Sequence, residues 1–137
     1  MTLKELSQLY HLNHEIEIDQ ERLMALKTKA FKIGIPSYKD MPKNLAVENR
    51  IERYVAEMVD LEAIIQAKLA QCMYERNRLE RYISNIPDSL TRQIFLMRFI
   101  KGMSWQQIAF KVGGGNTAEG VRKRVYRYLE RANIGKG

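Results

Sequence analysis

This sequence is poor in cysteine and proline and has no long hydrophobic run. Its single cysteine, Cys72, allows no internal disulfide and, with only two histidines in 137 residues, cannot assemble a cysteine-rich zinc site. No apolar run approaches the roughly 20 residues that cross a bilayer. The start, MTLKELSQLY, has acidic and amide side chains where a secretion signal would be hydrophobic. We therefore expect a soluble, cytoplasmic protein with no membrane partner and no stabilisation by metal or disulfide.

The positive charge is concentrated toward the C-terminus. Residues 1–84 hold 13 Lys plus Arg and 13 Asp plus Glu, so they are neutral. Residues 85–137 hold ten basic and three acidic residues and therefore carry the whole net charge of +7. A small segment this basic attracts polyanions through long-range Coulomb forces, and the usual polyanion in a cytoplasm is nucleic acid. This segment is the candidate for nucleic-acid binding.

Two long amphipathic helices are predicted in the neutral part. Over residues 2–32, apolar side chains recur at spacings of three, four or seven, as on one face of a helix. From residue 45 to about residue 85, a second pattern alternates steps of four and three, and only Lys68 and Glu75 interrupt it. Cys72 lies on this second seam, where we expect a small buried hydrophobic residue.

A connector separates the two helices. Residues 33–44 contain Gly34, Pro36 and Pro42, and each proline disfavours helix in the residue before it. The connector would let the first helix fold back antiparallel along the second, which at 1.5 Å per residue is roughly 60 Å long. Because the first helix is about ten residues shorter, part of the apolar seam would stay uncovered. This predicts a homodimer.

A shorter helix is predicted after the second long one. Pro87 cannot continue a hydrogen-bonded helix, and Asp88 or Ser89 can cap a new one. That helix covers about residues 89–101, and Gly102 is a fitting C-terminal stop.

Two more helices are predicted beyond it. Ser104 and Gln107 have the Ser-x-x-Gln spacing of a capping box. The three glycines at 113–115 end the helix that this box opens, and Asn116 or Thr117 caps a last one. Three short helices joined so tightly predict a helix-turn-helix bundle.

The last helix carries the predicted contacts with DNA. In a helix-turn-helix, its exposed residues near the N-terminus reach base edges in the major groove. Arg122 and Lys123 can donate to guanine or phosphate, Glu119 can accept from cytosine, and the free N–H groups of the helix N-terminus suit a phosphate. The residues predicted to face the bases are Thr117, Ala118, Glu119, Arg122, Lys123 and Tyr126, and those predicted to contact phosphates are Arg124, Arg127 and Lys111.

Residues 86–131 also carry a characteristic set of motifs. The set comprises the entry Ile86-Pro87, the pair Arg98-Phe99 before Gly102, the pair Ile108-Ala109, and a capped helix from Thr117 through Val121-Arg122. It resembles the DNA-reading region 4 of bacterial sigma factors. With the long helices and the connector in front, the whole layout is similar to phage and prophage regulators of the ArpU and RinA type, which carry a sigma region 4-like domain.

The resemblance implies base-contacting positions at Ala118, Glu119, Gly120, Arg122 and Lys123. Sigma factors often have charged residues at the positions of Ala118 and Gly120, so a sequence preference other than the minus-35 element is implied. The chain also lacks an aromatic-rich, strand-melting region of the sigma kind. The resemblance therefore implies a regulator and not a complete sigma factor.

We expect no enzyme and no cofactor. His11, His14 and Glu15 could form a surface metal site, but two histidines on a charged helix face are usually solvated. The glycines at 113–115 lack the following Gly-Lys-Ser/Thr of a phosphate-binding loop. No catalytic arrangement of side chains is recognisable.

Two other functions stay open. One is a coiled-coil interaction protein whose C-terminal bundle binds RNA polymerase, which region 4 domains also contact. The other is the small DNA-recognition subunit of a phage packaging terminase. Packaging subunits form rings, whereas a regulator should be a dimer.

The sequence thus predicts an all-α protein in two parts. Residues 1–85, with the linker 33–44, form a helical hairpin that dimerises, and residues 86–137 form a sigma region 4-like helix-turn-helix domain. The expected function is sequence-specific binding of double-stranded DNA by a transcriptional regulator of phage or prophage type.

Overall fold

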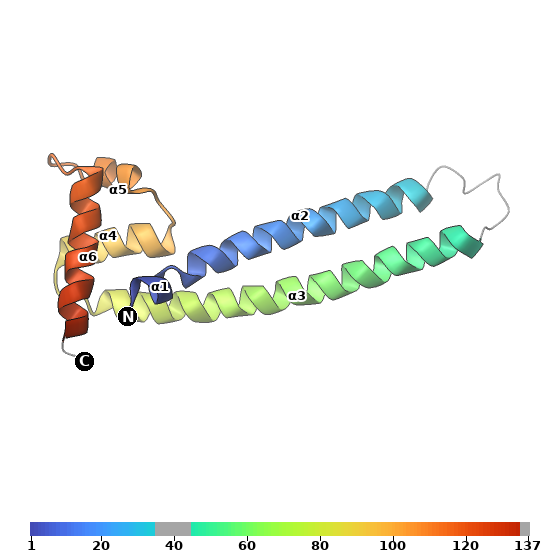
Figure 1. Cartoon of the computed structure of the whole chain (residues 1–137), viewed down its shortest axis with the longest axis horizontal. Helices are drawn as coiled ribbons and strands as arrows, with labels where there is room; N and C mark the ends of the chain where they lie inside the picture. The colour runs from blue at the N-terminus through green and yellow to red at the C-terminus, as the bar shows by residue number, and fades with distance from the viewer. Residues whose placement is uncertain (35–44, 135–137) are drawn as a thin grey trace. The chain divides into compact units, whose positions relative to one another are not determined.

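The computed structural model describes residues 1–34 and 45–134, and the regular structure in these ranges is helical throughout (Figure 1). The all-α prediction is confirmed. Most of the predicted connector, at 35–44, and residues 135–137 lie outside the described residues. None of the described helices combines the length and apolarity needed to cross a membrane. In chain order, the elements are α1 (Leu3–Leu6), α2 (Gln8–Gly34), α3 (Leu45–Ser84), α4 (Ser89–Phe95), the π-helix η1 (Leu96–Ile100), α5 (Trp105–Val112) and α6 (Ala118–Ile134).

The first predicted helix is divided near its start. α1 begins after Thr2, whose Oγ1 accepts a hydrogen bond from the N–H of Glu5 at 3.2 Å, and α2 begins one residue after Ser7. The backbone of Ser7 stays in the right-handed region, at φ −82° and ψ −5°. Because serine is compatible with both helix and turn, the apolar spacing gave no signal for this division. The second predicted helix is confirmed as α3.

The chain forms two compact units. Unit 1 comprises residues 1–12 and 72–137, and unit 2 comprises residues 13–71. The sequence predicted a division after residue 85, whereas unit 1 also includes the N-terminal segment and the last part of α3. By sequence, unit 1 holds 14 basic and six acidic residues, a net charge of +8, and unit 2 holds nine and ten, a net charge of −1.

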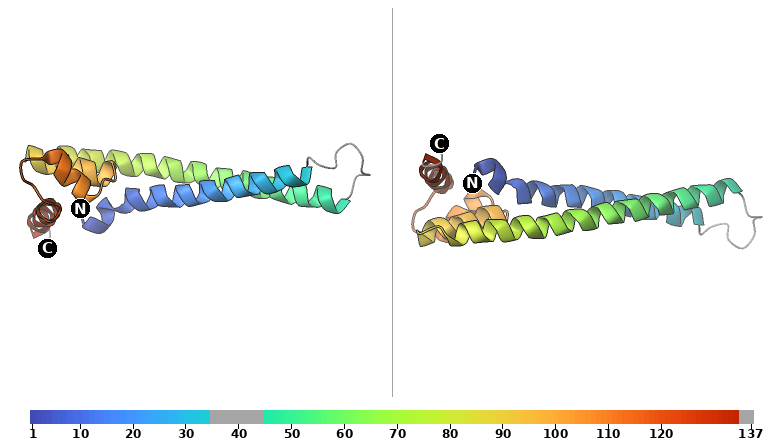
Figure 2. Two further views of the ribbon diagram at one scale, coloured as in Figure 1. Left: turned by 90° about the horizontal axis from the view of Figure 1, so that it is seen from above. Right: turned by 90° about the horizontal axis from the view of Figure 1, so that it is seen from below.

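In unit 2, α2 and α3 pack side by side in opposite directions (Figure 2). Two ion pairs show the direction: Lys68 pairs with Asp19, and Lys27 pairs with Glu62. Residue 19 precedes residue 27 along α2, whereas its partner 68 follows residue 62 along α3, so the two helices are antiparallel. Ile16, Leu61 and Ile65 are buried.

Lys68, which interrupts the apolar pattern of α3, has a charged partner on α2. Its Nζ donates a hydrogen bond to Oδ2 of Asp19, a residue only 5% exposed, and lies 3.8 Å from Glu15. The bond to Asp19 raises the pKa of Lys68 above its ordinary value. A paired charge inside an apolar seam favours one register of the two helices, because any shift would leave Asp19 buried without its partner.

Unit 1 contains the short helices that follow α3. Asp88 caps α4: its Oδ2 accepts from the N–H of Thr91 at 3.1 Å. The predicted helix over residues 89–101 consists of α4 and the π-helix η1, a change of helix type that apolar spacing does not reveal. The capping box of Ser104 and Gln107 is confirmed with both of its hydrogen bonds.

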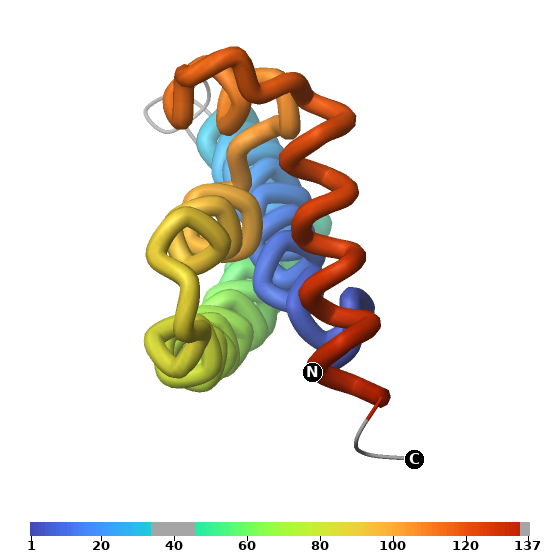
Figure 3. Tube along the Cα trace, turned by 90° about the vertical axis from the view of Figure 1, so that its left-hand side faces the viewer, coloured from blue at the N-terminus to red at the C-terminus, as the bar shows by residue number. Residues whose placement is uncertain are grey.

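α6 packs against α4 and α5 (Figure 3). Its Val121, Val125 and Leu129 are buried, and Phe95 of α4 meets Tyr128 edge-on with ring centres 5.3 Å apart. Cys72, also in unit 1, is buried as expected. The packed face of α6 therefore fixes which of its side chains point outward.

Candidate nucleic-acid interface

A glycine turn and a threonine cap set the start of α6. Gly113, Gly114 and Gly115 have φ values of +67°, +62° and +78°, a region that other residues rarely occupy. Nδ2 of Asn116 donates to the carbonyl of Gly113 at 2.8 Å and closes the turn. Oγ1 of Thr117 then accepts the N–H of Gly120 at 3.0 Å, which is the geometry of an N-cap. Of the two predicted caps, Thr117 is the one that holds the helix.

Gly120 is tightly placed beside this cap. A Cβ added at Gly120 would lie 3.1 Å from Oγ1 of Thr117, closer than ordinary van der Waals contact. Gly120 is exposed and Ala118 is half-buried, so Glu119 is the one long side chain that the first turn of α6 presents to solvent.

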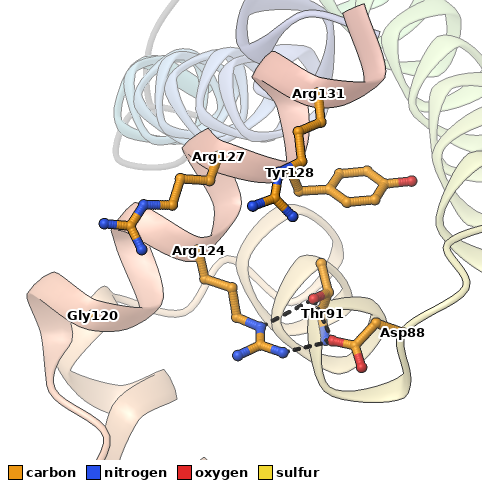
Figure 4. A pocket seen from close by; sticks show the side chains of 7 residues that line it. All are labelled: Asp88, Thr91, Gly120, Arg124, Arg127, Tyr128 and Arg131. Atoms are coloured by element: carbon orange, nitrogen blue, oxygen red, sulfur yellow. Dashed lines mark hydrogen bonds and ion pairs between the residues drawn. The ribbon is translucent and has the colours of Figure 1, made fainter.

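One flank of α6 forms a groove with α4. The groove has a volume of about 440 Å³ and is shown in Figure 4. We call it the arginine groove. Its lining consists of Asp88, Thr91, Gly120, Arg124, Arg127, Tyr128 and Arg131.

Arg124 is tied to α4 by two hydrogen bonds. Its Nη2 donates to Oδ2 of Asp88 at 2.7 Å and its Nε donates to Oγ1 of Thr91 at 3.1 Å (Figure 4). The hydroxyl of Thr91 in turn donates to Asp88 at 2.6 Å. These contacts, first Thr91 and then Arg124, lower the pKa of Asp88 to about 2. In this structure the guanidinium of Arg124, predicted to contact phosphate, instead joins α6 to α4.

Arg127 and Arg131 remain available in the same groove. Both are exposed, and neither forms a hydrogen bond or ion pair with any other described residue. Arg131 was not among the predicted DNA contacts. Its spacing of four from Arg127 and seven from Arg124 was the signal in the sequence, since residues at these intervals share a helix face.

On the opposite flank of α6, Glu119 and Arg122 form a salt bridge with each other. Arg122 donates to both oxygens of Glu119, at 2.6 Å from Nη2 and 3.2 Å from Nε, and its guanidinium carbon lies 5.1 Å from the ring centre of Tyr126. The pair lowers the pKa of Glu119 and raises that of Arg122. The side chains of Glu119 and Arg122, each predicted to contact a base, are therefore joined in one bidentate ion pair.

The two predicted lysines lie apart from these sets. Lys123 is exposed on α6, four residues before Arg127, and Lys111 is exposed in the last turn of α5. Neither forms an ion pair with a described residue, so both amines are free to meet an anion.

Two further arginines of the basic segment support the fold. Nη1 of Arg92 donates to the carbonyl of Ile86 at 2.8 Å. Nη1 of Arg98 donates to the carbonyl of Met103 at 3.0 Å, and its guanidinium lies 4.2 Å from the centre of the Trp105 ring. A count of charges in the sequence cannot distinguish these structural arginines from exposed ones.

Comparison with known protein families, with curated proteins and with solved structures finds no match for this chain. Over the ranges that the structure describes, no group of three or more His, Cys, Asp or Glu side chains could hold a metal ion, and this covers His11, His14 and Glu15.

Proposed function

We propose that this protein binds double-stranded DNA sequence-specifically and regulates transcription, through a helix-turn-helix of the sigma region 4 type formed by α4, α5 and α6. The observation that carries the proposal is the exposed cationic row Lys123, Arg127 and Arg131 on a helix that two other helices hold in place. The net charge of +8 on unit 1, against −1 on unit 2, supports the same assignment.

Different residues of α6 contribute to the affinity for DNA and to the selectivity for its sequence. Arg127 and Arg131 contact phosphates, which gives affinity without regard to sequence, and Lys123, predicted from the sequence to face the bases, joins them because it lies in the same exposed row. Arg122 and Glu119 face the bases: an arginine donates two bonds to guanine, and a glutamate accepts from cytosine. Arg124 holds α6 on α4 and so positions the helix.

The salt dependence of DNA binding tests this proposal. The double variant Arg127→Ala/Arg131→Ala should flatten the log-log plot of affinity against salt by about 1.8, since each lost phosphate contact removes roughly 0.9 from the slope. The matched control is Arg50→Ala/Arg53→Ala, which removes two exposed arginines from α3 of unit 2. The proposal fails if the natural protein ignores duplex DNA in dilute salt, or if both double variants bind alike.

A protein partner at α5 is a second candidate, favoured by an exposed aromatic side chain. Phe110 is 89% exposed and lines a hollow of about 450 Å³ with Met103, Gln106, Gln107 and Lys111. Large exposed apolar side chains often mark protein contacts. Because region 4 domains contact RNA polymerase, that enzyme is the partner to test: Phe110→Ser should reduce its retention on the immobilised protein and leave DNA affinity unchanged.

A further inference from the structure

Besides the seam that packs on α2, α3 carries a second line of side chains, which is apolar at both ends and polar in the middle. Its members follow one another at spacings of four, three, four, three and four residues, the spacing of a coiled-coil seam. At 100° per residue, the line lies roughly 100° around the helix from Leu61 and Ile65. We call it the outer stripe. It consists of Val55, Val59, Glu62, Gln66 and Leu69 in unit 2, followed by Met73 in the part of α3 that belongs to unit 1.

The apolar members of the outer stripe are exposed. Val55 is 46% exposed, Val59 59%, Leu69 39% and Met73 68%. Two pairs of neighbouring exposed apolar side chains on one line of a helix, Val55 with Val59 and Leu69 with Met73, are typical of an interaction surface, because exposed apolar residues more commonly occur singly.

Side chains of α2 extend this face within unit 2. Lys27 lies 4.0 Å from Glu62, so this flank of α2 adjoins the stripe. Met24 and Phe31, at intervals of three and four from Lys27, are 64% and 66% exposed. A groove of about 390 Å³ between the helices is lined by residues that include Gln20, Leu23, Val59, Glu62 and Gln66.

The flank of α3 turned away from the stripe has a different character. At the edge of the α2 seam farther from the stripe, Lys68 pairs with Glu15 and Asp19 of α2, and Arg22 of α2 lies 3.7 Å from Asp19. Ile64, 48% exposed, is an apolar residue on that flank of α3. The ion pairs of Lys68 therefore lie across the α2 seam from the outer stripe.

The order of residues along the stripe points to the partner. Read from Val55 to Met73, it runs apolar, apolar, polar, polar, apolar, apolar, and it reads the same way in reverse about a midpoint between Glu62 and Gln66. A two-fold interface needs this property, because residue i of one copy meets residue j of the other and j meets i. Unit 2 has a net charge of only −1, so two copies repel each other little.

We propose that the outer stripe binds the outer stripe of a second copy of this chain, with the two α3 helices antiparallel. Val55 then meets Met73 of the other copy and Val59 meets Leu69. Glu62 meets Gln66, whose amide donates a hydrogen bond to the carboxylate. A parallel pair would place Glu62 against Glu62, and this like-charge contact disfavours that direction. The inference concerns assembly and does not depend on DNA binding.

Disulfide cross-linking tests the direction of the pair. Two chains are made in a Cys72→Ala background, one with Glu62→Cys and the other, of different mass, with Gln66→Cys. On oxidation, the mixture should yield a linked species joining positions 62 and 66, and neither chain alone should link comparably. The proposal is overturned if the Glu62→Cys chain links to itself as efficiently as it links in the mixture. It is also overturned if the mixture yields no linked species.

Charge insertion tests the surface. Val59→Glu/Leu69→Glu should make the full chain monomeric in sedimentation velocity at tens of micromolar, where the natural chain is a dimer. The matched control Ile64→Glu adds a charge at an exposed apolar position off the stripe and should stay dimeric. A natural chain that sediments as a monomer or as a ring, a dimeric double variant, or a monomeric control would each contradict the assignment.

Discussion

At the scale of single residues, the arginines of unit 1 have different roles, which depend on whether the guanidinium group has a partner in the protein. Arg92 and Arg98 bond to backbone carbonyls, and Arg124 joins two helices through Asp88 and Thr91. Arg127 and Arg131 have exposed guanidinium groups and no described partner. Only residues of the second kind can exchange counterions for DNA phosphates without first losing a contact in the protein.

The Asp88 carboxylate should make part of the stability dependent on acid pH. Its pKa is lowered from 3.8 to about 2, so the ionised form stabilises the folded state above about pH 4, and this contribution is lost as pH falls toward 2. Asp88→Asn keeps a capping oxygen but loses the charge. We expect the variant to be less stable at pH 7 and to lose less stability between pH 4 and pH 2, as measured by urea unfolding. The exposed Asp60→Asn is the control, and an unchanged acid profile in Asp88→Asn would contradict the role of this carboxylate.

Arg122 should matter for sequence choice more than for general affinity. Arg122→Ala should weaken binding to a selected DNA sequence by roughly 5- to 150-fold while changing binding to random duplex little, because a base contact carries sequence information and a phosphate contact does not. Competition titration with the two kinds of DNA measures this ratio. Equal loss on both would make Arg122 a phosphate contact.

At the scale of elements, the short helices are set by local hydrogen bonds at their ends. Asp88, Ser104 and Thr117 each accept a backbone N–H at the start of a helix. Such caps are local in sequence and were therefore predictable, apart from the choices between Asp88 and Ser89 and between Asn116 and Thr117. The π-helix η1 was not predictable, since apolar spacing does not distinguish it from the α-helix around it.

The capping box of α5 should contribute measurably to stability. Ser104→Ala removes the acceptor for the N–H of Gln107 and should lower the free energy of unfolding by about 0.5–2 kcal/mol. Denaturant unfolding followed by circular dichroism measures the change. Ser84→Ala is a suitable control, because the hydroxyl of Ser84 bonds only to carbonyls of its own helix. A loss no larger than that of the control would show that the box is dispensable.

At the scale of the whole molecule, unit 1 is assembled from distant parts of the sequence. Nδ2 of Asn133 donates to the carbonyl of Met1 at 3.2 Å, and Arg78 lies 3.3 Å from Glu5. Leu6 and Leu79 are fully buried. The short C-terminal helices α4, α5 and α6 therefore belong to a unit that also includes residues that precede position 86.

The composition of unit 1 predicts that a substitution far in sequence from α4, α5 and α6 lowers the stability of this unit. Leu6→Ala should destabilise unit 1 by about 2–5 kcal/mol, the usual cost of truncating a buried leucine. Leu3→Ala, at a position 39% exposed, should cost much less. Thermal unfolding monitored by Trp105 fluorescence compares the two. Similar losses in both variants would contradict the packing described here.

A fragment of residues 86–137 gives a second measurement of the same core. It lacks Leu6, Leu79 and Ile83, which are buried in unit 1 of the full chain. We expect the fragment to unfold at a lower temperature than the full chain and, as a monomer, to bind DNA more weakly. A fragment as stable as the full chain would show that the bundle folds independently.

The sequence by itself determined the helical class, the extent of α3 and, to within one residue, where the short helices begin, because these features depend on spacings and caps within a few residues. Only the tertiary structure decided which arginines are exposed, that Lys68 meets Asp19, and that the N-terminal segment belongs to the basic unit. Those outcomes depend on contacts between residues tens of positions apart in the sequence. The spacing of apolar and charged residues within a few positions does not indicate which distant side chain a residue will contact.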